Sequence, residues 1–457
     1  PLFAETKDGL EYYLADKLDI SEDGLTYTLH INDKATWSDG EPVTVKDIKF
    51  TIDYGVLVYG GPTSFTKVNG GEVQINEIDD KTMEFVLPSV YDNYVRTLSQ
   101  FYPMPAHAFD NDPSKINDST YFKTPGMATS GAYVVSEINE DSFVYTARDD
   151  YYRGTPSVKK VVMKTIGSGS TKQIEFENGG IDYMRVTSAE DLKKYKEESD
   201  KYNMYSISEA RLNYLQLNPH GPVMSTLSQD ARKAIFLALD KDAIVDFAWG
   251  SDELAEPANS LITPDQSIYN KDCKGYNFNL EEAKKLAKSS GLEGKELTYI
   301  YNSDRANMEA VATVVQQQLA EIGVTVNIES CDTSTFFPRF FASKDKELAT
   351  TWDLGTNGWD SQRGSNCGQA ISYFTNRLCD CGYSDEVSGL AQKAIGTADA
   401  KEKQELWNTI QDKALEECWE YPLTYTNFVM VSQKNVTGLD GSSVVPEFID
   451  YLSIHVD

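Results

Sequence analysis

A strand, a helix and a second strand in the later half of the chain constrain its fold more than any other feature. Residues 297–301 and 324–328 each predict a strand, and the residues from Asn307 to Ile322 predict a helix that Gly323 ends. The apolar stripe of this helix consists of Val311, Val314, Val315, Leu319 and Ile322. Two strands joined through a helix pair in parallel with a right-handed crossover. The later half is therefore expected to be α/β.

The earlier half predicts sheets joined by short helices and turns. Residues 25–31 alternate between apolar and polar side chains, which indicates a strand with one face in the core. Thr44 and the acid Asp47 three residues later predict the start of a helix. Residues 132–135 and 142–148 predict a hairpin. Because single cores stop growing near roughly 250–300 residues, a chain of 457 residues is expected to form two or three lobes.

The charge balance excludes several classes of partner. The chain has 42 Lys and Arg against 71 Asp and Glu, a formal net charge of −29. Such a charge repels phosphate backbones and anionic head groups, so neither nucleic acid nor an anionic membrane is expected as a partner. No apolar run approaches the ~18–20 residues that span a bilayer. Residues 1–8 lack the features of a signal peptide, so the chain is expected to be a processed or truncated piece.

The cysteines raise the question of a metal site. They are Cys273, Cys331, Cys367, Cys379, Cys381 and Cys418. Zinc is disfavoured because a single residue separates Cys379 from Cys381 and no histidine lies near them in the sequence. A disulfide from Cys367 to Cys379 or Cys381 is favoured in an oxidising compartment, and free buried thiols are the alternative. We expect no metal and no cofactor.

An ordered set of motifs runs along nearly the whole chain. The motifs occupy residues 14–18, 23–29, 37–47, 104–107, 130–133, 148–154, 180–182, 214–218 and 231–241, and they include Trp-Ser-Asp-Gly-Glu-Pro at 37–42. In order and spacing they resemble the extracytoplasmic oligopeptide- and dipeptide-binding proteins, family 5 of the solute-binding proteins that serve ABC importers.

This resemblance implies an α/β protein with a two-lobed periplasmic-binding-protein-like fold of type II and an additional subdomain. The expected boundaries are 1–125 for the extra subdomain of the first lobe, 126–214 plus 434–457 for the first lobe, and 215–433 for the second lobe.

The resemblance also implies a function. The protein is expected to capture peptides or peptide-like ligands in an interlobe cleft and to deliver them to the permease subunits of an ABC importer. It is expected to be a monomer outside the cytoplasm, in the periplasm or lipid-anchored at the outer face of the cell membrane. A receptor of the same fold for a sugar, a chelated metal or a signalling molecule is the alternative. Catalysis is not expected, because the sequence has no Gly-x-Ser-x-Gly, His-Glu-x-x-His, Walker or dinucleotide-binding motif.

Ligand contacts in the family lie around the tryptophan at 359. The expected binding residues here are Asn357, Trp359, Asp360 and Arg363, with the alternative that Trp359 fills a core. Family members that grip a peptide's amino terminus usually place an aspartate about three residues after this tryptophan, where this chain has Gln362. A free α-amino group on the ligand is therefore not strongly favoured.

Further candidates lie in the segment that leads to Asn218, where the family's chain crosses between lobes, and in an earlier turn. Arg211, Asn213 and Tyr214 are predicted ligand contacts, and Arg211 is suited to bidentate hydrogen bonding with a carboxylate. The alternative is a surface arginine beside a core tyrosine. Ser130 is a candidate in a turn before a strand, a position where a small polar residue also suits the turn itself.

Overall fold

The computed structural model describes residues 1–6, 9–91, 93–167, 169–342, 346–360, 370–375, 381–441 and 450–457. The chain divides into two compact units. Unit 1 comprises Pro1–Arg185, Glu198–Tyr205 and Met430–Asp457, and unit 2 comprises Val186–Glu197 and Ser206–Val429. Strands β13 (Tyr202–Leu217) and β18 (Glu420–Gln433) each contribute residues to both units. The lobe boundaries expected from the resemblance stay a prediction.

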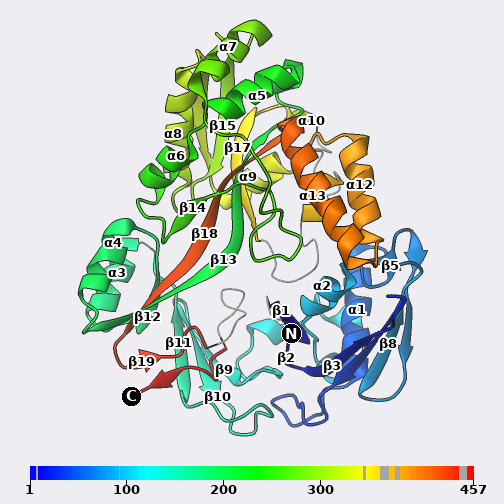
Figure 1. Ribbon diagram of the computed structural model, residues 1–457. Coiled ribbons are helices and arrows are strands. Elements are labelled where there is room, and N and C mark those ends of the chain that lie inside the picture. Colours follow the sequence, from blue (N-terminus) through cyan, green and yellow to red (C-terminus); the bar gives the residue numbers. More distant parts are fainter. Residues whose placement is uncertain are drawn as a thin grey trace. The chain divides into compact units, whose positions relative to one another are not determined.

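The first part of unit 1 is built on an antiparallel sheet in the strand order β3-β4-β8-β7 (Figure 1). Its strands are β3 (Ala15–Ile20), β4 (Thr26–Ile31), β7 (Gln74–Glu77) and β8 (Thr82–Val86). Strand β4 buries Tyr27, Leu29 and Ile31, which confirms the alternation predicted for residues 25–31. Helix α1 (Val45–Tyr59) begins at a capping box of Thr44 and Asp47, as predicted.

A second sheet of unit 1 contains the predicted hairpin. Strands β9 (Tyr133–Ile138) and β10 (Ser142–Ala147) pair antiparallel, and β11 (Lys160–Lys164) pairs with the other edge of β10. The shorter elements are β1 (Phe3–Thr6), β2 (Gly9–Tyr12), β5 (Lys67–Val68), β6 (Gly71–Glu72), β19 (Val436–Thr437), β20 (His455–Val456), α2 (Tyr94–Ser99) and α3 (Gly169–Glu177).

The largest sheet has the strand order β12-β18-β13-β17-β15-β16, with β14 paired to β18. Its other strands are β12 (Tyr183–Val186), β14 (Ala255–Pro257), β15 (Glu296–Asn302), β16 (Thr325–Cys331) and β17 (Leu354–Asp360). Strand β15 runs parallel to both β16 and β17. Helix α8 (Met308–Ala320) connects β15 to β16. The predicted βαβ unit is therefore confirmed.

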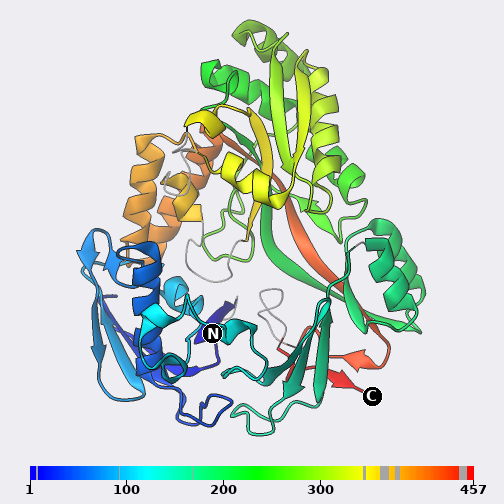
Figure 2. The ribbon, with the colours of Figure 1, turned by 180° about the vertical axis from the view of Figure 1, so that it is seen from behind.

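Helices pack around this sheet in unit 2. They are α4 (Ala189–Glu197), α5 (Gln229–Ala238), α6 (Lys241–Ala248), α7 (Leu280–Ser290), α9 (Thr333–Phe340), α10 (Lys346–Ala349), α11 (Ala370–Phe374), α12 (Asp385–Ile395) and α13 (Ala400–Glu417). The side chain of Asp240 accepts a hydrogen bond from the N–H of Ala243 and caps α6, so α5 and α6 are separate helices. Helices α12 and α13 lie side by side in Figure 1, and Figure 2 shows α9 in front of the sheet.

The cysteines include both free thiols and a disulfide. Cys273, Cys331 and Cys418 are free and buried, and Cys381 is disulfide-bonded. Cys367 and Cys379, which the sequence analysis considered with Cys381, lie outside the described residues. Within the described ranges, no helix is both long and apolar enough to cross a bilayer.

Candidate ligand-binding site

Two neighbouring strands of unit 2 bring most of the predicted residues together. In the antiparallel pairing of β13 with β17, the opposed residues are Arg211 with Asp360, Leu212 with Trp359, Asn213 with Gly358, and Tyr214 with Asn357. Six of the eight predicted positions therefore occupy four consecutive rungs. Asp360 is described only as the last residue of β17, and Arg363 lies outside the described residues. Ser130 belongs to unit 1.

Tyr214 and Trp359 lie in an aromatic cluster. The Tyr214 hydroxyl donates to the Tyr373 hydroxyl at 3.1 Å, and burial raises the pKa of Tyr214 well above its ordinary value. The Trp359 ring centroid lies 4.2 Å from that of Tyr373 and 5.6 Å from that of Tyr214. Trp359 is 2% exposed and Tyr214 is fully buried. Both rings thus pack against unit 2, and their contact with a ligand stays a prediction.

Two polar atoms on β17 are buried without a hydrogen-bond partner in the described part of the chain. They are the Nε1 of Trp359 and the Oδ1 of Asn357. A buried polar atom left without a partner costs about 1–3 kcal/mol, so such an atom requires an explanation. The two residues are two apart on one strand, and their side chains therefore share a face. Together they offer one donor and one acceptor, the pair of groups that an amide complements.

Arg211 lies across the backbone of β17. Its Nε donates to Asn213 Oδ1 at 3.2 Å, and Asn213 Nδ2 donates to Thr424 Oγ1 at 3.1 Å on strand β18. A Cβ atom at Gly358 would overlap the Arg211 guanidinium and come within 2.7 Å of Asn213 Oδ1. The absence of a side chain at Gly358 is therefore what permits this position of the guanidinium.

A backbone irregularity precedes Arg211, and sequence analysis did not detect it. Ala210 has a φ of 48° inside β13, although alanine is disfavoured in the left-handed region. Its N–H donates to Ser208 Oγ at 3.1 Å, and Ser208 Oγ donates to Asp265 Oδ2 at 2.6 Å. A kink of this kind redirects the side chains that follow it. No pattern of residue types marks Ala210, because glycine or asparagine is the usual signal of such a backbone.

Glu420 is a second feature that the sequence did not reveal. Its carboxyl is completely buried at the start of β18, and burial raises its pKa to about 8. The hydroxyl of Tyr383 donates to Glu420 Oε2 at 2.7 Å, which partly opposes the effect of burial on the pKa. Oε1 has no hydrogen-bond partner among the described residues. Glu420 is therefore mostly a neutral acid at pH 7.

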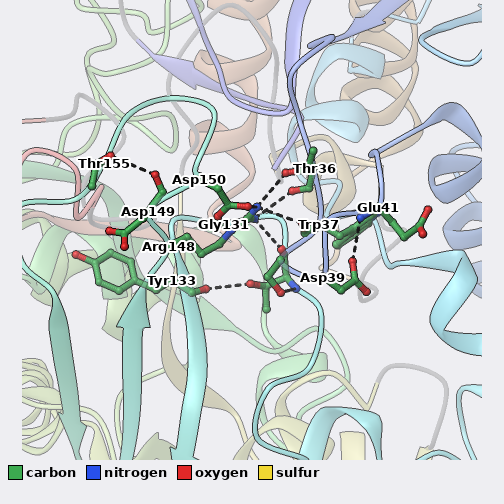
Figure 3. A network of polar contacts seen from close by, with 12 residues as sticks. Thr36, Trp37, Asp39, Glu41, Gly131, Tyr133, Arg148, Asp149, Asp150 and Thr155 are labelled. Atoms are coloured by element: carbon green, nitrogen blue, oxygen red, sulfur yellow. Dashed lines mark hydrogen bonds and ion pairs between the residues drawn. The ribbon is translucent and has the colours of Figure 1, made fainter.

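The turn that contains Ser130 is held by Arg148 (Figure 3). The Arg148 side chain is 3% exposed, and its Nη1 donates to the carbonyl oxygens of Thr36 and Thr129, each at 3.1 Å. Its Nη2 donates to Trp37 O at 3.1 Å, and its Nε donates to Asp150 Oδ1 at 3.0 Å. One guanidinium thus joins the 36–37 segment to the 129–131 turn, 92 residues later in the sequence.

The described residues contain no group of three or more His, Cys, Asp or Glu side chains that could hold a metal ion. Cys367 and Cys379, which the zinc question concerned, are outside them. The arrangement offers hydrogen-bonding groups and aromatic surface.

Comparison with known proteins defines the class to which this molecule belongs. AppA of Clostridium difficile, described as a peptide-binding protein, is 27% identical, with a TM-score of 0.89 over 100% of this chain and 94% of that protein. The substrate-binding protein CtaP of an ABC transporter of Listeria monocytogenes is 28% identical, with a TM-score of 0.87 over 100% of this chain and 92% of that protein. The molecule therefore has the two-lobed, type II fold of the periplasmic binding proteins, as predicted.

The chain belongs to the bacterial extracellular solute-binding proteins of family 5, whose sequence pattern matches residues 9–377. Proteins of Brucella species described as ABC transporter peptide-binding proteins are 26% identical over 71% of this chain. The chain spans about 60% of the length of these curated relatives. Membership of this family confirms the predicted resemblance, the expectation that the protein is not an enzyme, and an extracytoplasmic location.

Proposed function

We propose that this protein captures peptides or peptide-like ligands and delivers them to the permease subunits of an ABC importer. The observation that carries the proposal is the family match over residues 9–377, together with likeness over the whole chain to AppA and CtaP. A binding cleft between the lobes, a monomeric state, and residence in the periplasm or on a lipid anchor are parts of the same proposal.

The chemistry of β17 supports a ligand with amide groups. Extended peptides are commonly recognised through their main-chain N–H and C=O groups, with roomy pockets for the side chains. The Nε1 donor of Trp359 and the Oδ1 acceptor of Asn357, which find no partner within the described ranges, suit such groups. Arg211 lies opposite Asp360 and therefore on the other face of the sheet, where its guanidinium carries the positive charge that a carboxylate requires.

Thermal unfolding with defined probes tests this proposal. Dialanine and Ser-Thr-Ser-Ala, the peptide held by DppA of Helicobacter pylori, represent short peptides. A ligand that binds only the native state adds RT ln(1 + [L]/Kd) to stability, about 2.7 kcal/mol at a hundredfold excess over Kd. We expect an upward shift of the melting temperature with at least one peptide, and the peptides should be recovered uncleaved by mass spectrometry.

The alternative is a receptor of the same fold for another ligand. AgaA of Agrobacterium tumefaciens holds agropinic acid and NikZ of Campylobacter jejuni holds Ni(L-His), and each is 19% identical to this chain. These two compounds belong in the same screen. If either compound raised the melting temperature and no peptide did, this alternative would replace the peptide proposal.

A further inference from the structure

Some hydrogen-bonding groups of the 129–131 turn are engaged within the protein, and others are not. Thr129 is fully engaged, since its N–H donates to Ser38 Oγ at 3.1 Å, its carbonyl accepts from Ser38 N at 2.9 Å, and its hydroxyl donates to Tyr133 O at 2.9 Å. The carbonyl of Gly131 accepts from Arg148 Nη1 at 3.4 Å. The N–H groups of Ser130 and Gly131 and the Ser130 hydroxyl have no hydrogen-bond partner in the described part of the chain.

The guanidinium of Arg148 is suited to holding the 129–131 turn in a way that the ammonium of a lysine is not. Arginine presents five N–H donors in a planar fork, whereas lysine presents three donors at one point. Arg148 uses its fork to reach Thr36, Trp37, Thr129 and Gly131 together with the carboxylate of Asp150. Its only ion-pair partner among the described residues, Asp150, is 63% exposed at its side chain. A buried charge with one exposed partner therefore serves mainly to hold main-chain carbonyl groups.

We propose that Arg148 is a positioning residue for ligand binding, which holds the 129–131 turn so that Ser130 and Gly131 hydrogen-bond the main chain of a bound peptide. This inference rests on the proposed function, because a peptide supplies carbonyl oxygens for the unused donors. A turn ordered before binding does not lose conformational freedom when the ligand arrives, so its hydrogen bonds contribute more fully to affinity. Arg148 acts through the turn and does not contact the ligand.

Hydrogen exchange in the ligand-free protein tests the positioning role. In Arg148→Lys, we expect the amide of Thr129 to exchange at least about tenfold faster, because its contact with Ser38 depends on the held turn. Amides of the β9–β10 pairing should keep their rates. The matched control is Arg153→Lys, since Arg153 is a partly buried arginine of the same unit that pairs with Asp450 at 3.0 Å. Equal exchange of the Thr129 amide in wild type and Arg148→Lys would overturn the positioning role.

A double-mutant cycle with Ser-Thr-Ser-Ala as probe tests the link to the ligand. By calorimetry, Arg148→Lys should weaken binding about tenfold and Ser130→Ala about fivefold, and the double variant should bind no more weakly than Arg148→Lys alone. If Arg148 were purely structural, the two effects on affinity would be independent. The inference would therefore be contradicted if the affinity losses of the two single variants multiplied in the double variant, or if Arg148→Lys bound the peptide with unchanged affinity. Absence of binding by the wild-type protein would count against the proposed function and against a peptide at this turn, whereas the exchange result decides the positioning role by itself.

Discussion

Replacing Glu420 with glutamine should stabilise the protein at neutral pH. Glu420 is fully buried, and burial raises its pKa from 4.5 to about 8. The unfolded chain releases this proton near pH 4.5, while the folded protein retains it up to about pH 8. Folding between these pH values therefore takes up a proton, and stability falls by about 1.4 kcal/mol for each pH unit of increase. At pH 7 this loss amounts to about 3 kcal/mol.

Glutamine removes this dependence because it is neutral at every pH and keeps an oxygen that can accept from Tyr383. Urea unfolding followed by tryptophan fluorescence at pH 5, 6, 7 and 8 measures the effect. The stability of Glu420→Gln relative to wild type should be smallest at pH 5 and should grow by about 3–4 kcal/mol by pH 8. The control is Glu416→Gln, a change at an exposed acid of α13 four residues earlier. A stability difference between wild type and Glu420→Gln that stays constant from pH 5 to pH 8 would refute a neutral buried carboxyl.

Three further outcomes are expected. Trp359→Ala should destabilise unit 2 by about 3–5 kcal/mol in urea unfolding. If the ring also lines the ligand site, the same change should lower the affinity for a peptide at least about 30-fold. A folded variant with unchanged peptide affinity would make Trp359 a core residue only. Ala210→Gly should raise unfolding stability by about 0.5–1 kcal/mol because glycine relieves the left-handed backbone, whereas the control Ala255→Gly in β14 should lower it; a loss in both would contradict strain at Ala210. Reduction with dithiothreitol should lower the stability of the wild-type protein by about 2–4 kcal/mol, and Cys381→Ser should abolish this response. A wild-type melting temperature that does not change on reduction would contradict a stabilising disulfide at Cys381.

Local patterns in the sequence were sufficient for much of the fold. The alternation in β4, the capping box of Thr44 and Asp47, and the βαβ unit from β15 to β16 depend on neighbours a few residues apart. These elements can be predicted from the sequence because local backbone geometry determines side-chain periodicity and capping. The family resemblance then supplied the two-lobed fold, since ordered motifs along the chain carry information that no single segment has.

The candidate site could be predicted only in part from the sequence. The resemblance selected positions on β13 and β17, and the structure shows that Asn357 and Trp359 face the core of unit 2 with polar atoms that have no partner among the described residues. Residue type alone could not distinguish a tryptophan that lines a ligand pocket from one that packs on Tyr373. Gly358 likewise reads as a flexible position in the sequence, although its role is to make room for Arg211.

The sequence by itself determined the class of fold, the acidic character and the absence of known catalytic motifs, because each is a property of composition, of short segments or of the order of those segments along the chain. Only the tertiary structure decided that Glu420 is neutral, that Ala210 is strained and that Arg148 holds a turn 17 residues before it. The physical reason is that desolvation and shared hydrogen bonds arise from groups distant in the chain: Glu420 meets Tyr383 across 37 residues, and Arg148 meets Thr36 across 112. A pKa or a backbone conformation set by such neighbours leaves no mark on the residues next to it in the sequence.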